Sequence, residues 1–296
     1  MSDTTASLRR KIHSAGDLQS VVRTMKALAA SSIGQYEQSV RALGDYYRTV
    51  ELALGVGFRQ SGPAEKTPEI RPADAGAIGA VVFGSDQGLV GQFNDAVADH
   101  AVQTLGALTD KPRIWAVGER VHARLADAGL PPLGLFTVPN SVRAIAPLVG
   151  QILVESEARR SRDGIVGLHL FYNRPSSGAV YGPVHQRLLP LDETWRQELV
   201  ELRWPTKNLP EILGGGTATL PSLIREYLFV SLFRACAESL ASENASRLAA
   251  MQRAEKNIDE LLEELNGTFH RLRQSGIDAE LFDVISGFEA LGVEES

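Results

Sequence analysis

Proline is absent from both ends of this chain of 296 residues and crowded in its middle. None occurs between residues 5 and 58 and none follows Pro221, whereas all the others lie between Pro63 and Pro210. Because a proline inside a helix costs about 3 kcal/mol, the two proline-free ends favour two long helices around a compact insert. We expect the second helix to begin at Pro221.

Apolar residues at both ends recur at alternating steps of three and four, which places them on one seam of a left-handed supercoil. The N-terminal series is Leu8, Ile12, Ala15, Val22, Met25 and Ala29, then Tyr36, Val40, Leu43, Tyr47, Val50 and Leu54; the C-terminal series is Ile258, Leu262, Leu265, Phe269 and Leu272. The spacing predicts that the two helices pair as an antiparallel coiled coil, with the longer C-terminal helix projecting beyond its partner. The alternative is two bundle helices on a common core.

The middle of the chain alternates short apolar runs with helical patterns, which favours a largely parallel sheet covered on both faces. Expected strands cover 77–83, 113–117, 135–138 and 165–172, and expected helices cover 94–105, 119–128 and 142–161. Segments 180–190 and 198–204 are interpreted as edge strands or a hairpin. The predicted domains are a shaft of 1–58 with 221–296 and an α/β insert of 75–210, joined by linkers at 59–74 and 211–220.

Composition excludes several kinds of site. The single cysteine, Cys236, cannot form a disulfide within the chain. The six histidines lack metal-binding spacing and no nucleophile motif occurs, so we expect no metal, no cofactor and no catalytic residue. A net charge of −6 argues against a nucleic-acid partner. No apolar run reaches the length of about 18 residues that a membrane-spanning helix needs.

A glycine-rich turn follows the first expected strand, with glycines at Gly84, Gly88 and Gly91. This spacing differs from the dinucleotide-binding fingerprint, and Asp86 stands where a phosphate would need backbone N–H groups. We interpret Gly84, Asp86, Gly88 and Gly91 as a structural turn. A nucleotide-binding α/β enzyme with coiled-coil arms remains the alternative, as does a coiled-coil arm that binds RNA.

Four segments resemble the γ subunit of F-type ATP synthases, in the order of that family and across essentially the whole chain. They are LRRKI with VRTMKALAAS (8–12 and 22–31), SDQGLVGQFN (85–94), ASENASRLAAMQ (241–252), and LRQSGI with ISGFEAL (272–277 and 285–291). Glutamine at position 87 replaces the family's usual arginine. The chain also resembles the divergent alternative, sodium-type form of the bacterial enzyme.

The resemblance implies a Rossmann-like domain between the N- and C-terminal helices, and a coiled-coil shaft inside a ring of α and β catalytic subunits. The expected function is that of a central-stalk rotor, which couples ion flow across a membrane to ATP synthesis or hydrolysis by rotating. It performs no covalent chemistry of its own. The implied further partners are the ε subunit and the membrane c-type rotor ring, at the cytoplasmic face of a bacterial membrane.

The resemblance also implies which side chains touch these partners. Residues 9–26 are strongly basic, with Asp17 as their only acid, and the family's basic collar falls there. Met25 and Lys26 fall at family positions that face the β-subunit lever, and Arg273 with Gln274 matches an Arg-Gln pair that meets the β-subunit catch loop. The implied contact residues are Arg9, Arg10, Lys11, Met25, Lys26, Arg273 and Gln274.

Overall fold

The computed structural model describes residues 4–60, 76–108, 112–176, 180–208, 210–211 and 216–292, without the side chains of 161, 216–218 and 288–292. The chain divides into two compact units. We call residues 1–28 with 248–296 the coil unit, and residues 29–247 the sheet unit. Two long helices, α1 (Thr5–Gln60) and α6 (Gly216–Gly292), contribute to both units. Among the described residues, no helix is long and apolar enough to cross a membrane.

The sheet unit contains a five-stranded sheet in the order β3-β2-β1-β4-β5. The first four strands are parallel and β5 runs antiparallel to β4 at the edge. The strands are β1 (Ala77–Phe83), β2 (Arg113–Val117), β3 (Gly134–Phe136), β4 (Ile165–Arg174) and β5 (Gly182–Leu189). The predicted mixed α/β insert between two long helices is therefore confirmed.

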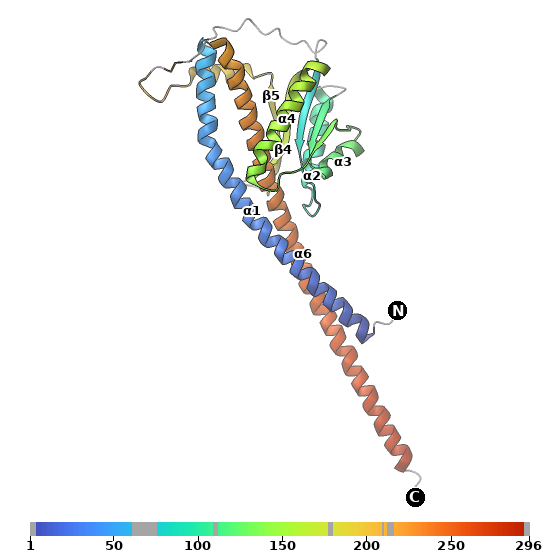
Figure 1. The fold of residues 1–296 in the computed structure, drawn as a ribbon. Coiled ribbons are helices and arrows are strands. Elements are labelled where there is room, and N and C mark those ends of the chain that lie inside the picture. The colour runs from blue at the N-terminus through green and yellow to red at the C-terminus, as the bar shows by residue number, and fades with distance from the viewer. Residues whose placement is uncertain are drawn as a thin grey trace. The chain divides into compact units, whose positions relative to one another are not determined.

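Helices cover both faces of the sheet, as the alternating pattern predicted (Figure 1). On one face, α2 (Phe93–Leu108) and α3 (Glu119–Asp127) bury the alternate β1 residues Ala80 and Val82. On the other, α4 (Val142–Asp163) and parts of α1 and α6 pack over Val81 and Phe83. The period of two along β1 thus divides its side chains between two apolar cores.

Burial along α1 follows the predicted seam. Leu8, Ala15, Val22, Ala29 and Tyr36, each seven residues after the last, are all buried. A strict seven-residue repeat is the pattern that produces a left-handed supercoil. Around Val22 the stripe reflects pairing with the partner helix, whereas Tyr36 already belongs to the large core of the sheet unit.

One expected edge strand is wrong. Residues 193–201 form a helix, α5 (Glu193–Glu201), and 202–204 follow it without regular structure. Asp192 caps this helix, because its Oδ1 accepts a hydrogen bond from the backbone N–H of Trp195 at 3.1 Å. Trp195 and Leu199, one turn apart, then pack against the apolar core. The capping aspartate was the signal that the strand interpretation missed.

The long helices extend further than expected. α1 continues to Gln60, and α6 begins at Gly216 rather than at Pro221, so parts of both expected linkers are helical. Pro221 removes one backbone hydrogen bond, and packing of Leu220 and Leu223 against the core favours the helical course. Positions 61–75 and 212–215, which hold the rest of these linkers, lie outside the described residues.

Candidate functional site

The coil unit has a register that its side-chain pairs define. The Arg9 guanidinium lies 5.6 Å from the centre of the Phe269 ring, and Gln19 donates a hydrogen bond to Asp259. Further along α1, Arg23 Nε donates to Glu255 Oε1 at 2.9 Å. As the residue number rises on α1 it falls on α6. The two helices therefore run antiparallel, as the sequence predicted.

Met25 and Lys26 face α6 within the coil unit. Met25 packs against the small apolar cluster of Val22, Met251 and Ile258, and Lys26 forms an ion pair with Glu255. Hydrogen bonds from Lys26 and Arg23 lower the pKa of the Glu255 carboxyl. Both side chains thus already have a structural role within the chain.

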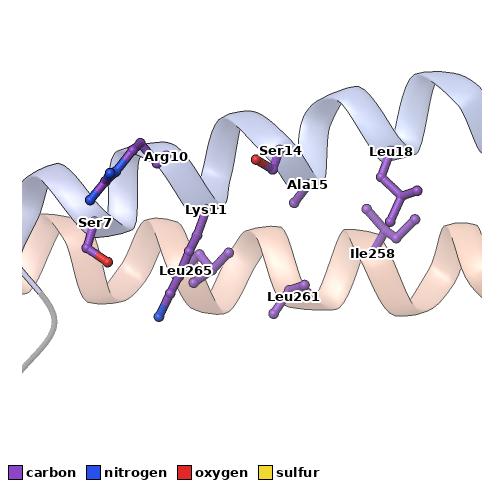
Figure 2. Close-up of a pocket in the computed structure, with 9 residues that line it drawn as sticks. All are labelled: Ser7, Arg10, Lys11, Ser14, Ala15, Leu18, Ile258, Leu261 and Leu265. Atoms are coloured by element: carbon purple, nitrogen blue, oxygen red, sulfur yellow. The ribbon is translucent and has the colours of Figure 1, made fainter. Parts of the chain in front are cut away.

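An open groove of about 590 Å³ runs along the coil (Figure 2). Figure 2 shows Lys11 reaching across α6 beside Leu265, and Leu18 pointing toward Ile258. Leu18 and Leu261 are about half exposed along it. The groove combines cationic groups with uncovered apolar surface; its lining residues are Ser7, Arg10, Lys11, Ser14, Ala15, Leu18, Ile258, Leu261 and Leu265.

The C-terminal end of α6 has uncovered apolar side chains. The register places Arg273 opposite the first turn of α1, and α6 continues from there to Gly292. Every described side chain from His270 to 287 is exposed. An exposed apolar surface of this extent marks an interaction site; its large apolar members are Leu272, Ile277, Leu281, Phe282, Val284 and Ile285.

In the sheet unit, Asp86 connects three parts of the chain. Its Oδ1 accepts a hydrogen bond from the backbone N–H of Glu119 at 3.0 Å, at the first residue of α3. Its Oδ2 accepts one from the N–H of Val138 at 2.9 Å, in the loop before α4. The carboxylate therefore caps a helix and joins two loops that follow neighbouring strands.

The N–H groups at the start of the glycine-rich turn are already bonded to neighbouring elements of the chain. The backbone N–H of Gly84 donates to the Val117 carbonyl, and that of Ser85 donates to Asn94 Oδ1 at 2.9 Å. A phosphate cradle requires such N–H groups to be unoccupied and requires no adjacent carboxylate. The turn therefore gives no support to the nucleotide-binding alternative.

Of the three glycines, Gly84 is required by sterics and Gly91 is favoured by its backbone conformation. A Cβ at Gly84 would lie 2.3 Å from the Val121 Cβ, and Gly91 has φ +57°. At Gly88 the nearest atom would be 3.8 Å away and φ lies outside the left-handed region, so this position does not need glycine. Leu89 instead adopts φ +63°, a conformation that is rare for a residue other than glycine and that no sequence pattern predicted.

Three comparisons with known proteins agree with this geometry. A family model described as ATP synthase matches residues 4–291. The chain is 30% identical to the ATP synthase gamma chain of Salinibacter ruber, over 98% of both chains. It is 25% identical to the ATP synthase gamma chain of Nautilia profundicola, over 97% of this chain and 99% of that one.

The chain belongs to the ATP synthase family. Its fold resembles a chain of the Euglena gracilis mitochondrial ATP synthase, solved as OSCP/F1/c-ring in rotational state 3, with a TM-score of 0.63. That match covers 99% of this chain and 96% of the other at 17% identity, so it shows the fold alone. The fold is that of the family's central-stalk γ subunit.

The structure brings the residues implied by the ATP synthase resemblance together only in part. Arg9 stacks on Phe269, and Arg10 and Lys11 line the groove. Arg273 and Gln274 are exposed where α6 leaves the first turn of α1. All seven lie in the coil unit, and their contacts with other subunits remain predictions.

Sequence reasoning missed a set of buried polar groups on α6. Glu238 and Glu243 are both buried, and Ser246 Oγ donates to the Val90 carbonyl of the turn at 2.5 Å. Burial raises the pKa of Glu243, against the effect of Arg247, whose Nη2 lies 2.7 Å from its Oε1. The signal was present in the ASENASR segment, which matched the ATP synthase pattern but was not assigned a packing role.

Proposed function

We propose that this γ-type chain is the central-stalk rotor of an ATP synthase, coupling ion flow across a membrane to ATP synthesis or hydrolysis. It rotates inside a ring of α and β subunits and performs no covalent chemistry itself. The observation that carries the proposal is the antiparallel coil whose α6 continues past the first turn of α1 with exposed apolar side chains. Together with full-length similarity to γ chains, this favours a shaft over an enzyme.

The mechanism follows from the asymmetry of a single shaft. One shaft in a ring presents a different side to each β subunit, so each side stabilises a different β conformation and nucleotide affinity. A ligand or partner shifts a conformational equilibrium only by its differential contacts. Each tenfold difference in nucleotide affinity requires a difference of about 1.4 kcal/mol in those contacts. Paired helices suit this role because they resist bending more than a single helix does.

The coil unit offers two surfaces with different chemistry for these contacts. The groove, with Arg10 and Lys11, suits an acidic segment of the ring, because charge complementarity steers and orients association. The uncovered end of α6 suits an apolar collar, and Arg273 and Gln274 supply donors for carbonyl or carboxylate groups there. We assign these contacts, with Arg9, Met25 and Lys26, to the α and β subunits.

The remaining assignments concern the other end of the complex. We propose that the sheet unit contacts the ε subunit and the c-type rotor ring, which places the chain at the cytoplasmic face of a bacterial membrane as a peripheral component. The sheet and its helices provide a folded body to which a rotating ring could attach. Full-length similarity to γ chains supports this assignment.

Assembly with the catalytic subunits tests the proposal. The chain is co-expressed with α and β subunits of the same genome, and the product is analysed by gel filtration and an ATP hydrolysis assay. We expect one copy to co-elute with a ring of α and β subunits, and hydrolysis by the ring to depend on it. A chain that elutes alone, beside a ring that is equally active without it, would refute the proposal.

A second experiment addresses the assigned contacts. Arg273→Ala should lower coupling, measured as ATP-driven ion pumping per ATP hydrolysed, while leaving folding unchanged, because Arg273 is exposed. Arg253→Ala, an exposed arginine on the same helix, is the matched control. Unchanged pumping in the Arg273 variant would remove Arg273 from the contact surface.

A further inference from the structure

A buried carboxylate links α6 to the sheet. Glu238 of α6 is only 6% exposed. Its Oε1 accepts a hydrogen bond from Arg234 Nε at 2.8 Å, and its Oε2 accepts one from Arg174 Nε at 2.8 Å. Because Arg174 is the last residue of β4, one carboxylate fixes a point on α6 to the carboxyl end of a strand. We call Arg174, Arg234 and Glu238 the Glu238 cluster.

The Glu238 cluster extends into the sheet core and to α1. Arg174 Nη2 donates to the hydroxyl of the buried Tyr172 at 2.5 Å, and the Arg234 guanidinium lies 5.9 Å from the centre of the Tyr47 ring of α1. Burial raises the pKa of Tyr172 to about 12, so this hydroxyl stays protonated at neutral pH. The cluster therefore joins three elements of the sheet unit at one place.

Besides the Glu238 cluster and a few other polar pairs, α6 is attached to the sheet unit through a large apolar core. Tyr227, Val230 and Ala237 of α6 belong to the large core that also contains Leu148 and Val149 of α4. Apolar burial is non-directional and depends on the area removed from water. Close packing of this apolar face holds the helix against the sheet and also opposes its rotation, without a fixed distance or angle between any two atoms. Charge-assisted hydrogen bonds have a narrow range of distance and angle, so they add a more exact limit on the rotation of the helix.

We propose that Glu238 is a positioning residue that fixes the rotational setting of α6 relative to the sheet, so that torque applied to the sheet unit turns α6 without slip. This inference rests on the proposed rotor function. α6 is one continuous helix from Gly216 to Gly292, so the same backbone contains the Glu238 cluster and the α6 residues that we assign to contacts with the α and β subunits. The Ser246–Val90 hydrogen bond is a second fixing point on the same helix.

Two substitutions separate this role from a contribution to stability. Glu238→Met replaces the carboxylate with an apolar side chain of similar size and removes the hydrogen bonds from Arg174 and Arg234. Removing one partner of a buried ion pair is costly when the other charge stays buried, but here both arginines are partly exposed, so water can solvate them and we expect the cost to be small. Glu238→Gln keeps one acceptor oxygen and should restore part of the function. Arg174→Met removes the same link from the sheet side if Glu238→Met does not assemble.

Two control variants complete the set. Val149→Ala creates a cavity in the apolar core and lowers stability without touching the Glu238 cluster. Glu157→Gln weakens the exposed Arg225–Glu157 pair, which also connects α6 to a neighbouring helix, and exposed pairs contribute little. Val149→Ala tests whether a loss of stability alone changes coupling. Glu157→Gln tests whether weakening any link between α6 and another helix does so.

The assay uses the complete ATP synthase in lipid vesicles. ATP hydrolysis and ATP-driven membrane potential are measured together, with a potential-sensitive dye that responds to charge movement whichever ion is coupled. We expect Glu238→Met to retain hydrolysis and melting temperature and to lose charge movement per ATP, with Glu238→Gln intermediate. Both controls should keep the ratio of the unsubstituted complex.

Two results would overturn the inference. One is a Glu238→Met complex that moves as much charge per ATP as the unsubstituted complex. The other is a ratio that falls in Val149→Ala as much as in Glu238→Met at the same loss of melting temperature. An unsubstituted complex whose hydrolysis and charge movement do not require this chain would refute the rotor function itself, so the two failures are distinguishable.

Discussion

The contribution of Asp86 to the free energy of unfolding can be worked out from its two hydrogen bonds. Asp86→Ala removes two hydrogen bonds, of 3.0 and 2.9 Å, and leaves the N–H groups of Glu119 and Val138 without their acceptor. Hydrogen bonds to a charged group contribute about 1.5–3 kcal/mol each. The lower value applies because Asp86 is half-buried and its negative charge lies near the Glu243 carboxyl. Repulsion between the two carboxylates helps to raise the pKa of Glu243. We therefore expect a loss of about 3 kcal/mol.

The assay for Asp86→Ala is thermal unfolding, with amide hydrogen exchange as a local measurement. At about 2–4 °C per kcal/mol for a chain of this size, the melting temperature should fall by about 6–12 °C. Asp86→Asn, which keeps one acceptor oxygen, should lose about half as much. Asp45→Ala, at an exposed position of α1, is the control and should change little.

The result that refutes this reasoning is specific. If Asp86→Ala melts like the unsubstituted chain, and the amides of Glu119 and Val138 exchange as slowly as before, the carboxylate does not hold these loops. A fall in melting temperature without faster exchange at those two amides would also contradict the assigned cause.

Three further predictions follow from buried groups of the sheet unit. Leu54→Ala should cost about 2–5 kcal/mol in urea unfolding, because Leu54 is fully buried, and an unchanged midpoint would show that its core has collapsed around the site. Burial lowers the pKa of His169 from 6.5 to about 4, and its Nδ1 lies 2.7 Å from His185 Nε2. Between pH 4 and pH 6.5 the folded state therefore binds fewer protons than the unfolded state. Stability should therefore fall as the pH falls from about 6.5 to about 4, and His169→Gln should flatten that profile; an equal slope in both proteins would contradict this. Cys236 is buried and its pKa is raised by burial, so a thiol reagent should modify it only at the rate of unfolding, and rapid labelling of the folded chain would be inconsistent with the structure.

Much of the fold could be predicted from the sequence because local signals and tertiary structure agree. Residues 77–83 and 113–117 are apolar runs bounded by breakers, and they form β1 and β2 with the predicted limits. The long helices followed from the absence of proline and from the seven-residue repeat that includes Leu8 and Val22. These are period and composition signals, which do not depend on partners distant in the sequence.

The errors arose where a local pattern was ambiguous or a distant partner decided. Segment 198–204 was read as a strand, although Asp192 caps a helix that begins before it. Asp86 was assigned to a structural turn, but its two donors lie 33 and 52 residues away, which the turn did not reveal. No spacing rule reveals such partners, because they depend on which strands become neighbours in the sheet.

The candidate site was less predictable than the fold for a related reason. Arg273 and Gln274 were selected by resemblance alone, and the structure places them on an exposed helix end without showing what they contact. Glu238 was not selected, because a carboxylate on a long helix is ordinarily solvated. Its burial depends on Arg174, which reaches it from β4.

Rotation of single complexes tests whether this chain is a shaft. Leu108→Cys places an exposed thiol on α2 for a bead, and the buried Cys236 need not be removed. With the α and β ring fixed to a surface, ATP should drive the bead in one direction, with one pause for each β subunit. A ring that hydrolyses ATP while the bead shows only undirected thermal motion would contradict the rotor function.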